Sequence, residues 1–82
     1  MMIPYDMSGS FLIQLLCKEW EYVFVHRVGS HVLLQTETPS QHRIIVPDHH
    51  VMKPWAFHAI LRSVAAHKRV SRATILTTET NP

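Results

Sequence analysis

His31 is the residue of this chain whose type and position most directly suggest chemistry. It directly follows the glycine-containing segment Val28-Gly29-Ser30, and His26 and Arg27 precede that segment. A neutral imidazole accepts a proton near pH 7, so a histidine held in a fixed position can act as a general base. The alternative interpretation of His31 is a surface histidine that only completes a turn.

A strand, a tight turn and a second strand must hold His31 in place. Residues 22–35 read Y-V-F-V-H-R-V-G-S-H-V-L-L-Q, and two runs rich in β-branched, aromatic and aliphatic residues flank the turn. Such runs favour strands. Gly29 tolerates the positive φ that a tight hairpin turn requires. The sequence therefore predicts a hairpin with His31 at the start of its second strand.

His49 and His50 raise the question of a metal site. Adjacent histidines seldom bind the same ion, and no cysteine or carboxylate cluster joins this pair at the spacing of a zinc site. Asp48 is the only acidic residue nearby. We therefore expect no metal. A loop contact with phosphate and simple exposure to solvent remain the two interpretations of His49.

The composition predicts one small folded domain. The chain has 82 residues, of which 46% are hydrophobic, and a formal charge of +2 with its seven histidines neutral. This size suffices for one core, and the positive charge favours phosphate-rich partners. No apolar run approaches the roughly 20 residues that span a membrane. Without a signal peptide, and with Cys17 as its one cysteine, the chain is expected to be cytoplasmic.

Local signals along the chain predict two main helices around three strands. Ser8 is a candidate N-cap with Ser10 as a second choice, and Pro54 suits the first position of a helix. Helical and strand patterns predict a helix over 9–19, strands over 22–27, 30–36 and 42–46, and a helix over 54–67.

The short links between these segments determine the predicted architecture. They favour an antiparallel meander, with one face of the sheet apolar and covered. The fold class is therefore α+β, in the order α-β-β-β-α, with both helices on one face of a three-stranded antiparallel sheet. Ser71 is a candidate cap for a short helix through Leu76. We expect residues 1–7 to be an extended lead-in and the end of the chain to be frayed.

Three segments of the chain match, in order and at similar spacing, the motifs of one protein family. They are Ser8-Gly9 before a helix with Leu15-Leu16; Gly29-Ser30-His31; and Val46-Pro47, His49 and Lys53-Pro54 before a helix with Ile60-Leu61. Together they resemble the HicA (YcfA-like) family of toxin endoribonucleases. That family has a double-stranded-RNA-binding-domain-like fold and partners the HicB antitoxin. The resemblance spans residues 8–76, the expected ordered core of a single domain over 1–82.

The resemblance implies an mRNA-cleaving toxin of a type II toxin–antitoxin system that uses no metal and no other cofactor. It implies that His31 is the catalytic residue, acting as general base on the 2′-hydroxyl that RNA itself supplies as nucleophile. It also implies messenger RNA and a HicB-like antitoxin as partners. Arg27 is expected to lie near His31 across the turn. RNA contacts are expected at Arg27, Gly29, Ser30, His49 and Lys53.

Two other functions remain open at this level. Lys53-Pro54-Trp55 stands where the family usually has a Gly-Thr start to its second helix, which favours a non-catalytic RNA-binding module on the same scaffold. The other alternative is a protein-interaction domain without a nucleic-acid role. Trp20 and Trp55 lie at predicted helix ends. We expect both to pack in the core or at its rim rather than to stack on bases.

Overall fold

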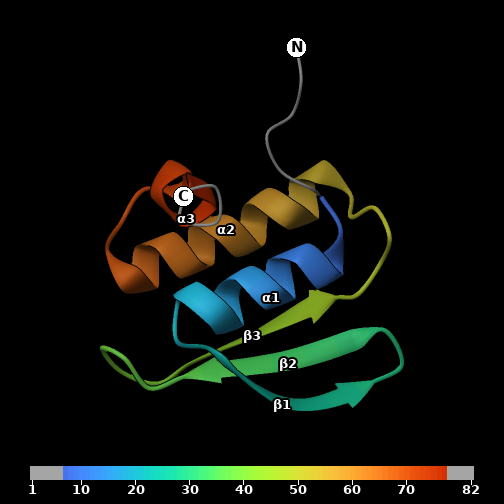
Figure 1. The fold of residues 1–82 in the computed structure, drawn as a ribbon, viewed down its shortest axis with the longest axis horizontal. Coiled ribbons are helices and arrows are strands. Elements are labelled where there is room, and N and C mark those ends of the chain that lie inside the picture. Colours follow the sequence, from blue (N-terminus) through green and yellow to red (C-terminus); the bar gives the residue numbers. More distant parts are fainter. Residues whose placement is uncertain (1–6, 78–82) are drawn as a thin grey trace.

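The computed structural model describes residues 7–77. In this range the elements are α1 (Gly9–Glu19), β1 (Val23–Val28), β2 (His31–Thr36), β3 (His42–Pro47), α2 (Pro54–Lys68) and α3 (Arg72–Thr77). The strands form an antiparallel sheet in the order β1-β2-β3, and α1 and α2 cover one of its faces (Figure 1). The predicted α+β class and meander are confirmed. Apart from Met7, the expected lead-in lies outside the described residues, as does the chain after Thr77.

Helix α1 begins and ends where the sequence predicts. The Ser8 side chain accepts a hydrogen bond from the Phe11 N–H at 3.1 Å and so caps the first turn. Leu12, Leu15 and Leu16 are buried against the sheet and α2. The apolar spacing of this helix therefore determines which of its faces packs against the core.

The core lies between β2, β3 and the helices. Side chains alternate along β2, where Val32 and Leu34 are fully buried and face Val46 and Ile44 of β3. Every residue of β1 is exposed. The expected covered face is therefore confirmed for β2 and β3 but not for β1, because the helices contact β3 and leave the β1 edge uncovered.

Helix α2 starts at Pro54, as predicted, and ends at Lys68, one residue later than predicted. Arg69 follows in the left-handed conformation, with φ 61°, and closes the helix. The predicted cap of α3 is confirmed, because the Ser71 hydroxyl accepts a hydrogen bond from the Thr74 N–H at 3.1 Å. No helix within residues 7–77 is both long and apolar enough to cross a membrane.

Candidate functional site

The turn between β1 and β2 positions His31. Val28 and His31 are paired across the strands, so Gly29 and Ser30 form a two-residue turn. Gly29 has a φ of 59°, whereas Ser30 is not in the positive region. Glycine at the first central position is typical of a type II′ turn, which matches the twist of a hairpin. His31 is thus the first residue of β2, which begins one residue later than the predicted strand over 30–36.

His31 lies on the open face of the sheet. Its neighbour Val32 is fully buried toward the helices, so the alternation of the strand directs His31 to the opposite face. Its partners across the strands are Val28 and Pro47. Within residues 7–77 the exposed His31 ring has no hydrogen-bond or ion-pair partner. The imidazole is therefore accessible to a ligand arriving from solvent.

Arg27 does not lie beside His31. It is paired with Val32, so its side chain projects to the face opposite His31. There its guanidinium donates to the Asp48 carboxylate at 2.9 Å, with the Arg27 side chain 47% exposed. The structure thus corrects the expected proximity of Arg27 and His31. His26, which is paired with Leu33, instead lies on the same face of the sheet as His31.

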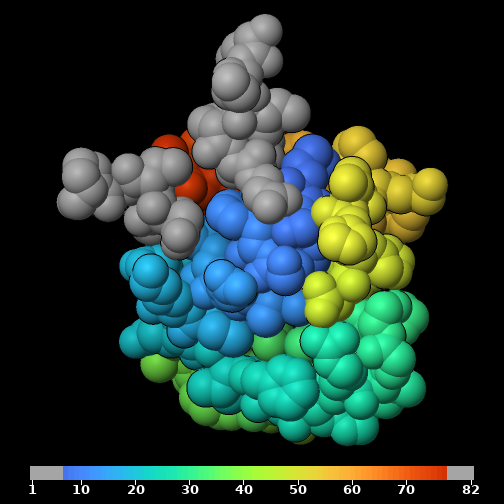
Figure 2. Space-filling model, turned by 45° about the vertical axis from the view of Figure 1, so that its right-hand side comes forward, coloured from blue at the N-terminus to red at the C-terminus, as the bar shows by residue number. Residues whose placement is uncertain are grey.

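The loop after β3 lies against both the hairpin and the start of α1, as Figure 2 shows. The Asp48 N–H donates to the Ser30 carbonyl at 2.6 Å, and the Ser30 hydroxyl lies 3.3 Å from His49 Nε2. The Gly9 N–H donates to the His49 carbonyl at 2.8 Å. The structure therefore brings together Ser30 and His49, two of the predicted RNA contacts.

Gly9 is required where α1 meets this loop. A Cβ atom added at Gly9 would lie 2.6 Å from the Asp48 Cα atom and closer still to the Pro47 carbonyl oxygen. Such distances are shorter than any ordinary contact, and the neighbours are backbone atoms that cannot turn away. Glycine thus allows the helix to approach the loop that carries His49.

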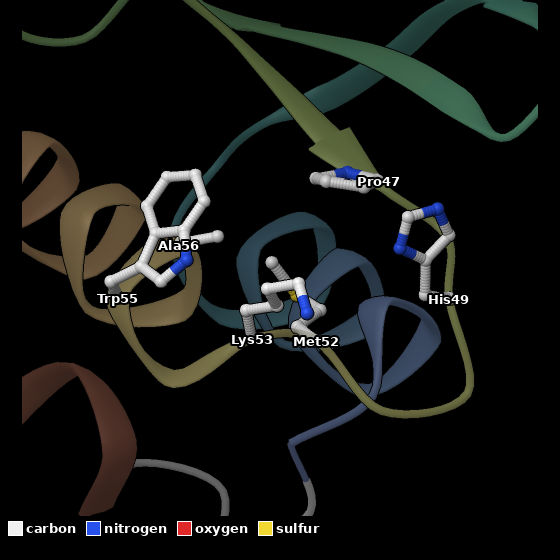
Figure 3. Close-up of a pocket in the computed structure, with 6 residues that line it drawn as sticks. All are labelled: Pro47, His49, Met52, Lys53, Trp55 and Ala56. Carbon is white, nitrogen blue, oxygen red and sulfur yellow. The ribbon is translucent and has the colours of Figure 1, made fainter.

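A pocket of about 190 Å³ lies between the end of β3 and the start of α2. Its lining residues, drawn in Figure 3, are Pro47, His49, Met52, Lys53, Trp55 and Ala56. Trp55 is 72% exposed, which overturns the expectation that it packs in the core or at its rim. The predicted site residues His49 and Lys53 both line the pocket.

Sequence reasoning did not assign Trp55 and Met52 to a site. A tryptophan one residue beyond a helix-starting proline and two beyond a lysine was the available signal for Trp55. The Met52 side chain is almost fully buried and contributes to the apolar side of the pocket. A separate polar hollow of about 240 Å³, lined by Ser10, Asp48, His49 and His50, lies on the α1 side of the loop.

A different group of titratable residues lies at the opposite end of the sheet. His42 Nδ1 is hydrogen-bonded to the Tyr22 hydroxyl at 2.8 Å, and His42 Nε2 lies 3.1 Å from the Ser63 hydroxyl. The His42 ring stacks on His67 with ring centroids 4.4 Å apart. Burial lowers the pKa of His42, and the nearby His67 and Lys68 lower it further. Burial also raises the pKa of Tyr22 to about 12.

No group of three or more histidine, cysteine, aspartate or glutamate side chains gathers in a metal-ligating arrangement within residues 7–77. No protein family, curated protein or solved structure matches this chain in comparisons with known proteins. The small α-β-β-β-α fold and the side chains around the hairpin are therefore the basis for a functional conclusion.

Proposed function

We propose that this chain is an RNA-cleaving toxin of the HicA type, a metal-free endoribonuclease that acts in the cytoplasm and uses His31 as general base. The observation that carries the proposal is the position of His31. Its ring is exposed, lies on the open face next to a tight turn, and has no partner within residues 7–77 that would occupy its nitrogens. A base must have a free nitrogen to accept a proton from a bound substrate.

The reaction uses the substrate's own nucleophile. The 2′-hydroxyl oxygen bonds to the adjacent phosphorus while the bond from phosphorus to the 5′-oxygen breaks, and His31 takes the hydroxyl proton. The leaving 5′-oxygen takes a proton from an acid such as a protonated imidazole or water. His26, on the same face, is a titratable neighbour available for this step. The products are a 2′,3′-cyclic phosphate and a 5′-hydroxyl.

The proposed RNA contacts surround the hairpin. Lys53 and His49 are exposed at the end of β3 and the start of α2, where each can contact a phosphate. Arg27 contributes through the exposed part of its guanidinium, although Asp48 neutralises much of its charge. Gly29 and Ser30 present turn backbone and a hydroxyl beside His31.

A HicB-like antitoxin is the proposed protein partner. Val23, Phe24 and Val28 on β1 are 60%, 55% and 62% exposed. They belong to a strand at the edge of the sheet, where one side of the backbone has no neighbouring strand among the described residues. Such an edge is a template for pairing with another chain, and a protein that also covered Val28 would lie next to His31, the cross-strand partner of Val28. Co-expression with the product of an adjacent small reading frame should relieve growth arrest, and the substitution Phe24→Lys should weaken that relief.

Purified protein and labelled single-stranded RNA test the nuclease directly. Wild type should cleave RNA equally well with and without a chelator, and His31→Ala should leave the RNA intact while melting at the wild-type temperature. Undiminished cleavage by His31→Ala would refute the assignment of His31. Loss of cleavage on adding chelator would refute the metal-free mechanism.

A non-catalytic RNA-binding module is the second candidate. It is favoured by the absence, within residues 7–77, of any side chain that orients the His31 ring, since a catalytic base is usually held by a third group. The same assay separates the two functions. RNA binding by wild type without any product would favour the binding module.

A further inference from the structure

The pocket between β3 and α2 takes no part in the proton transfers proposed above. We propose that it binds one nucleobase of single-stranded RNA, stacked on the Trp55 indole, with Lys53 on the neighbouring phosphate. This inference rests on the proposed function and adds to it a base-binding subsite. Figure 3 shows Trp55 and His49 on opposite sides of the pocket, with Pro47 at its β3 end and Met52 and Lys53 between them.

The size and chemistry of the pocket suit a single flat ring. Its volume of about 190 Å³ is below the ~300–1,000 Å³ of sites for drug-sized ligands. Trp55, Met52, Ala56 and Pro47 provide apolar contacts, which accept the face of any base. Such stacking supplies affinity without demanding a particular sequence.

The exposure of Trp55 supports a ligand over a packing role. Tryptophan is highly buried on average in folded proteins, whereas Trp55 is 72% exposed beside a hollow that its own ring helps to form. Leu61 and Phe57, on the same helix, are fully buried. The core is therefore complete without Trp55, and the indole ring remains free to stack on a ligand.

The charges at the pocket favour a nucleotide. Lys53 and His49 line it and no carboxylate does. The nearest acidic side chain on the loop, Asp48, is paired with Arg27 at 2.9 Å. The Lys53 side chain is exposed and has no hydrogen-bond or ion-pair partner within residues 7–77, so its ammonium group is available to a phosphate. The positive end of the α2 dipole adds to the same potential.

Pro47 connects this pocket to His31. It lines the pocket and is also the β3 partner of His31. Directly opposed residues on paired strands have Cβ atoms about 4.5–5.5 Å apart. A base stacked on Trp55 thus places the attached ribose and phosphates at the end of the sheet where His31 lies. The subsite would hold the strand in position for cleavage.

Binding is best measured in the His31→Ala protein, because the RNA then stays intact. The probe is a short fluorescein-labelled single-stranded RNA of mixed sequence, followed by fluorescence anisotropy. Adding Trp55→Ala should weaken binding about 5- to 150-fold, the range for loss of one aromatic–base stack. Trp55→Phe, which keeps a ring, should restore most of the affinity. Val51→Ala, which truncates a neighbouring side chain that is 76% exposed and does not line the pocket, should change nothing.

Two further readouts separate the contribution of base stacking from that of the phosphate contact. RNA should quench the fluorescence of wild-type protein much more than that of Trp55→Phe, in which Trp20 is the remaining tryptophan. Lys53→Gln should lower the salt dependence of binding by about 0.7 in logarithmic slope, the value for one phosphate on a single strand. Duplex RNA of the same length should compete poorly because its bases are not free to enter the pocket.

The outcomes separate this inference from the proposed function. If His31→Ala protein binds single-stranded RNA and Trp55→Ala leaves that affinity unchanged, the base subsite is wrong and the RNA-binding function stands. Equal competition by duplex RNA also overturns the subsite. If the parent protein binds no RNA at any salt concentration, both the function and the subsite are wrong.

Discussion

His42 and His67 lie at one end of the sheet, and His31 and His49 lie at the other. The two groups differ in how many hydrogen-bond partners their rings have. At the far end, both ring nitrogens of His42 have hydrogen-bond partners, and His67 stacks on His42 and bonds the Ser40 carbonyl at 2.9 Å. At the hairpin end, His31 has no partner within residues 7–77, and His49 has one long contact with Ser30. Polar groups whose hydrogen bonds are all made within the protein indicate a structural role. Exposed polar groups without such partners remain available to a ligand.

Lys68 and Lys53 show the same contrast between a hydrogen-bonded side chain and an exposed one. The Lys68 side chain is 7% exposed, and its ammonium group donates to Thr36 Oγ1 at 3.0 Å and to the Thr38 carbonyl at 2.7 Å. Burial lowers the pKa of Lys68, while Glu21 opposes that shift. Lys53 is exposed, and within the described residues its ammonium group has no hydrogen-bond or ion-pair partner. Lys68 thus ties α2 to the loop between β2 and β3, and Lys53 faces solvent beside a pocket.

The largest expected effect distinguishes the two ends by activity. His31→Ala should lower RNA cleavage by about 10²–10⁴-fold, the usual contribution of a general base, with no change in melting temperature. His67→Ala should keep the cleavage rate at temperatures where it is folded but lose about 1 kcal/mol of stability with its bond to Ser40. Cleavage assays and thermal melts of both variants check this. Equal loss of activity in both would abolish the distinction.

The next effect concerns the two glycines near the site. Gly9→Ala should lower the free energy of unfolding by about 3 kcal/mol, because the new methyl group meets backbone atoms of the His49 loop. Gly29→Ala should cost only about 1 kcal/mol, from the positive φ alone, because a Cβ there has open space. Urea unfolding of both variants measures the difference. A smaller cost at Gly9 than at Gly29 would show that the loop yields easily.

A third change tests the buried lysine. Lys68→Met keeps most of the apolar stem and removes the hydrogen bonds to Thr36 and Thr38. The expected cost is about 1–2 kcal/mol, or a fall of roughly 4–16 °C in melting temperature for a chain of this size. Lys53→Met is the matched control at the exposed end and should leave the melting temperature unchanged. A similar fall in both variants would contradict the structural role of Lys68.

The smallest effect is a pH dependence of stability at the far end. The pKa of His42 is lowered in the folded protein from its ordinary value of 6.5, so the unfolded chain binds the proton more readily. Stability from this group is therefore complete above pH 6.5 and is lost as the pH falls below it toward the lowered pKa. Tyr22, His67 and Lys68 are the titratable groups that face the His42 ring.

His42→Gln isolates this contribution, because glutamine keeps a donor and an acceptor and does not titrate. Melting temperatures measured from pH ~8 to pH ~5 should fall less steeply for His42→Gln than for wild type. Identical slopes would show that His42 does not govern the acid sensitivity of the fold.

Local sequence signals predicted the elements well. The Ser8 and Ser71 caps, Pro54 at the start of α2 and Gly29 in the turn each act within a few residues, and the structure has all four in their predicted places. Because these signals need no knowledge of the tertiary fold, they can be recognised from one sequence. The boundaries of β1, β2, β3 and α2 differ from prediction by one residue at one or both ends.

Long-range features could not be predicted from the sequence. The Arg27–Asp48 ion pair joins residues 21 positions apart, and it depends on a register that the sequence did not specify. The register of β1 against β2 shifts between Phe24 and His26, and no glycine there announces the irregularity in the sequence. The exposure of β1 and Trp55 depends on where the helices lie over the sheet, which residue spacing alone does not determine.

The chemical identity of the RNA ends left by the purified protein tests the central claim most directly. If His31 activates the 2′-hydroxyl, the upstream fragment must end in a 2′,3′-cyclic phosphate and the downstream fragment in a 5′-hydroxyl, and both must disappear in His31→Ala. Mass spectrometry of the fragments resolves these termini. Fragments ending in a free 3′-hydroxyl, or cyclic phosphate ends still produced by His31→Ala, would contradict the account.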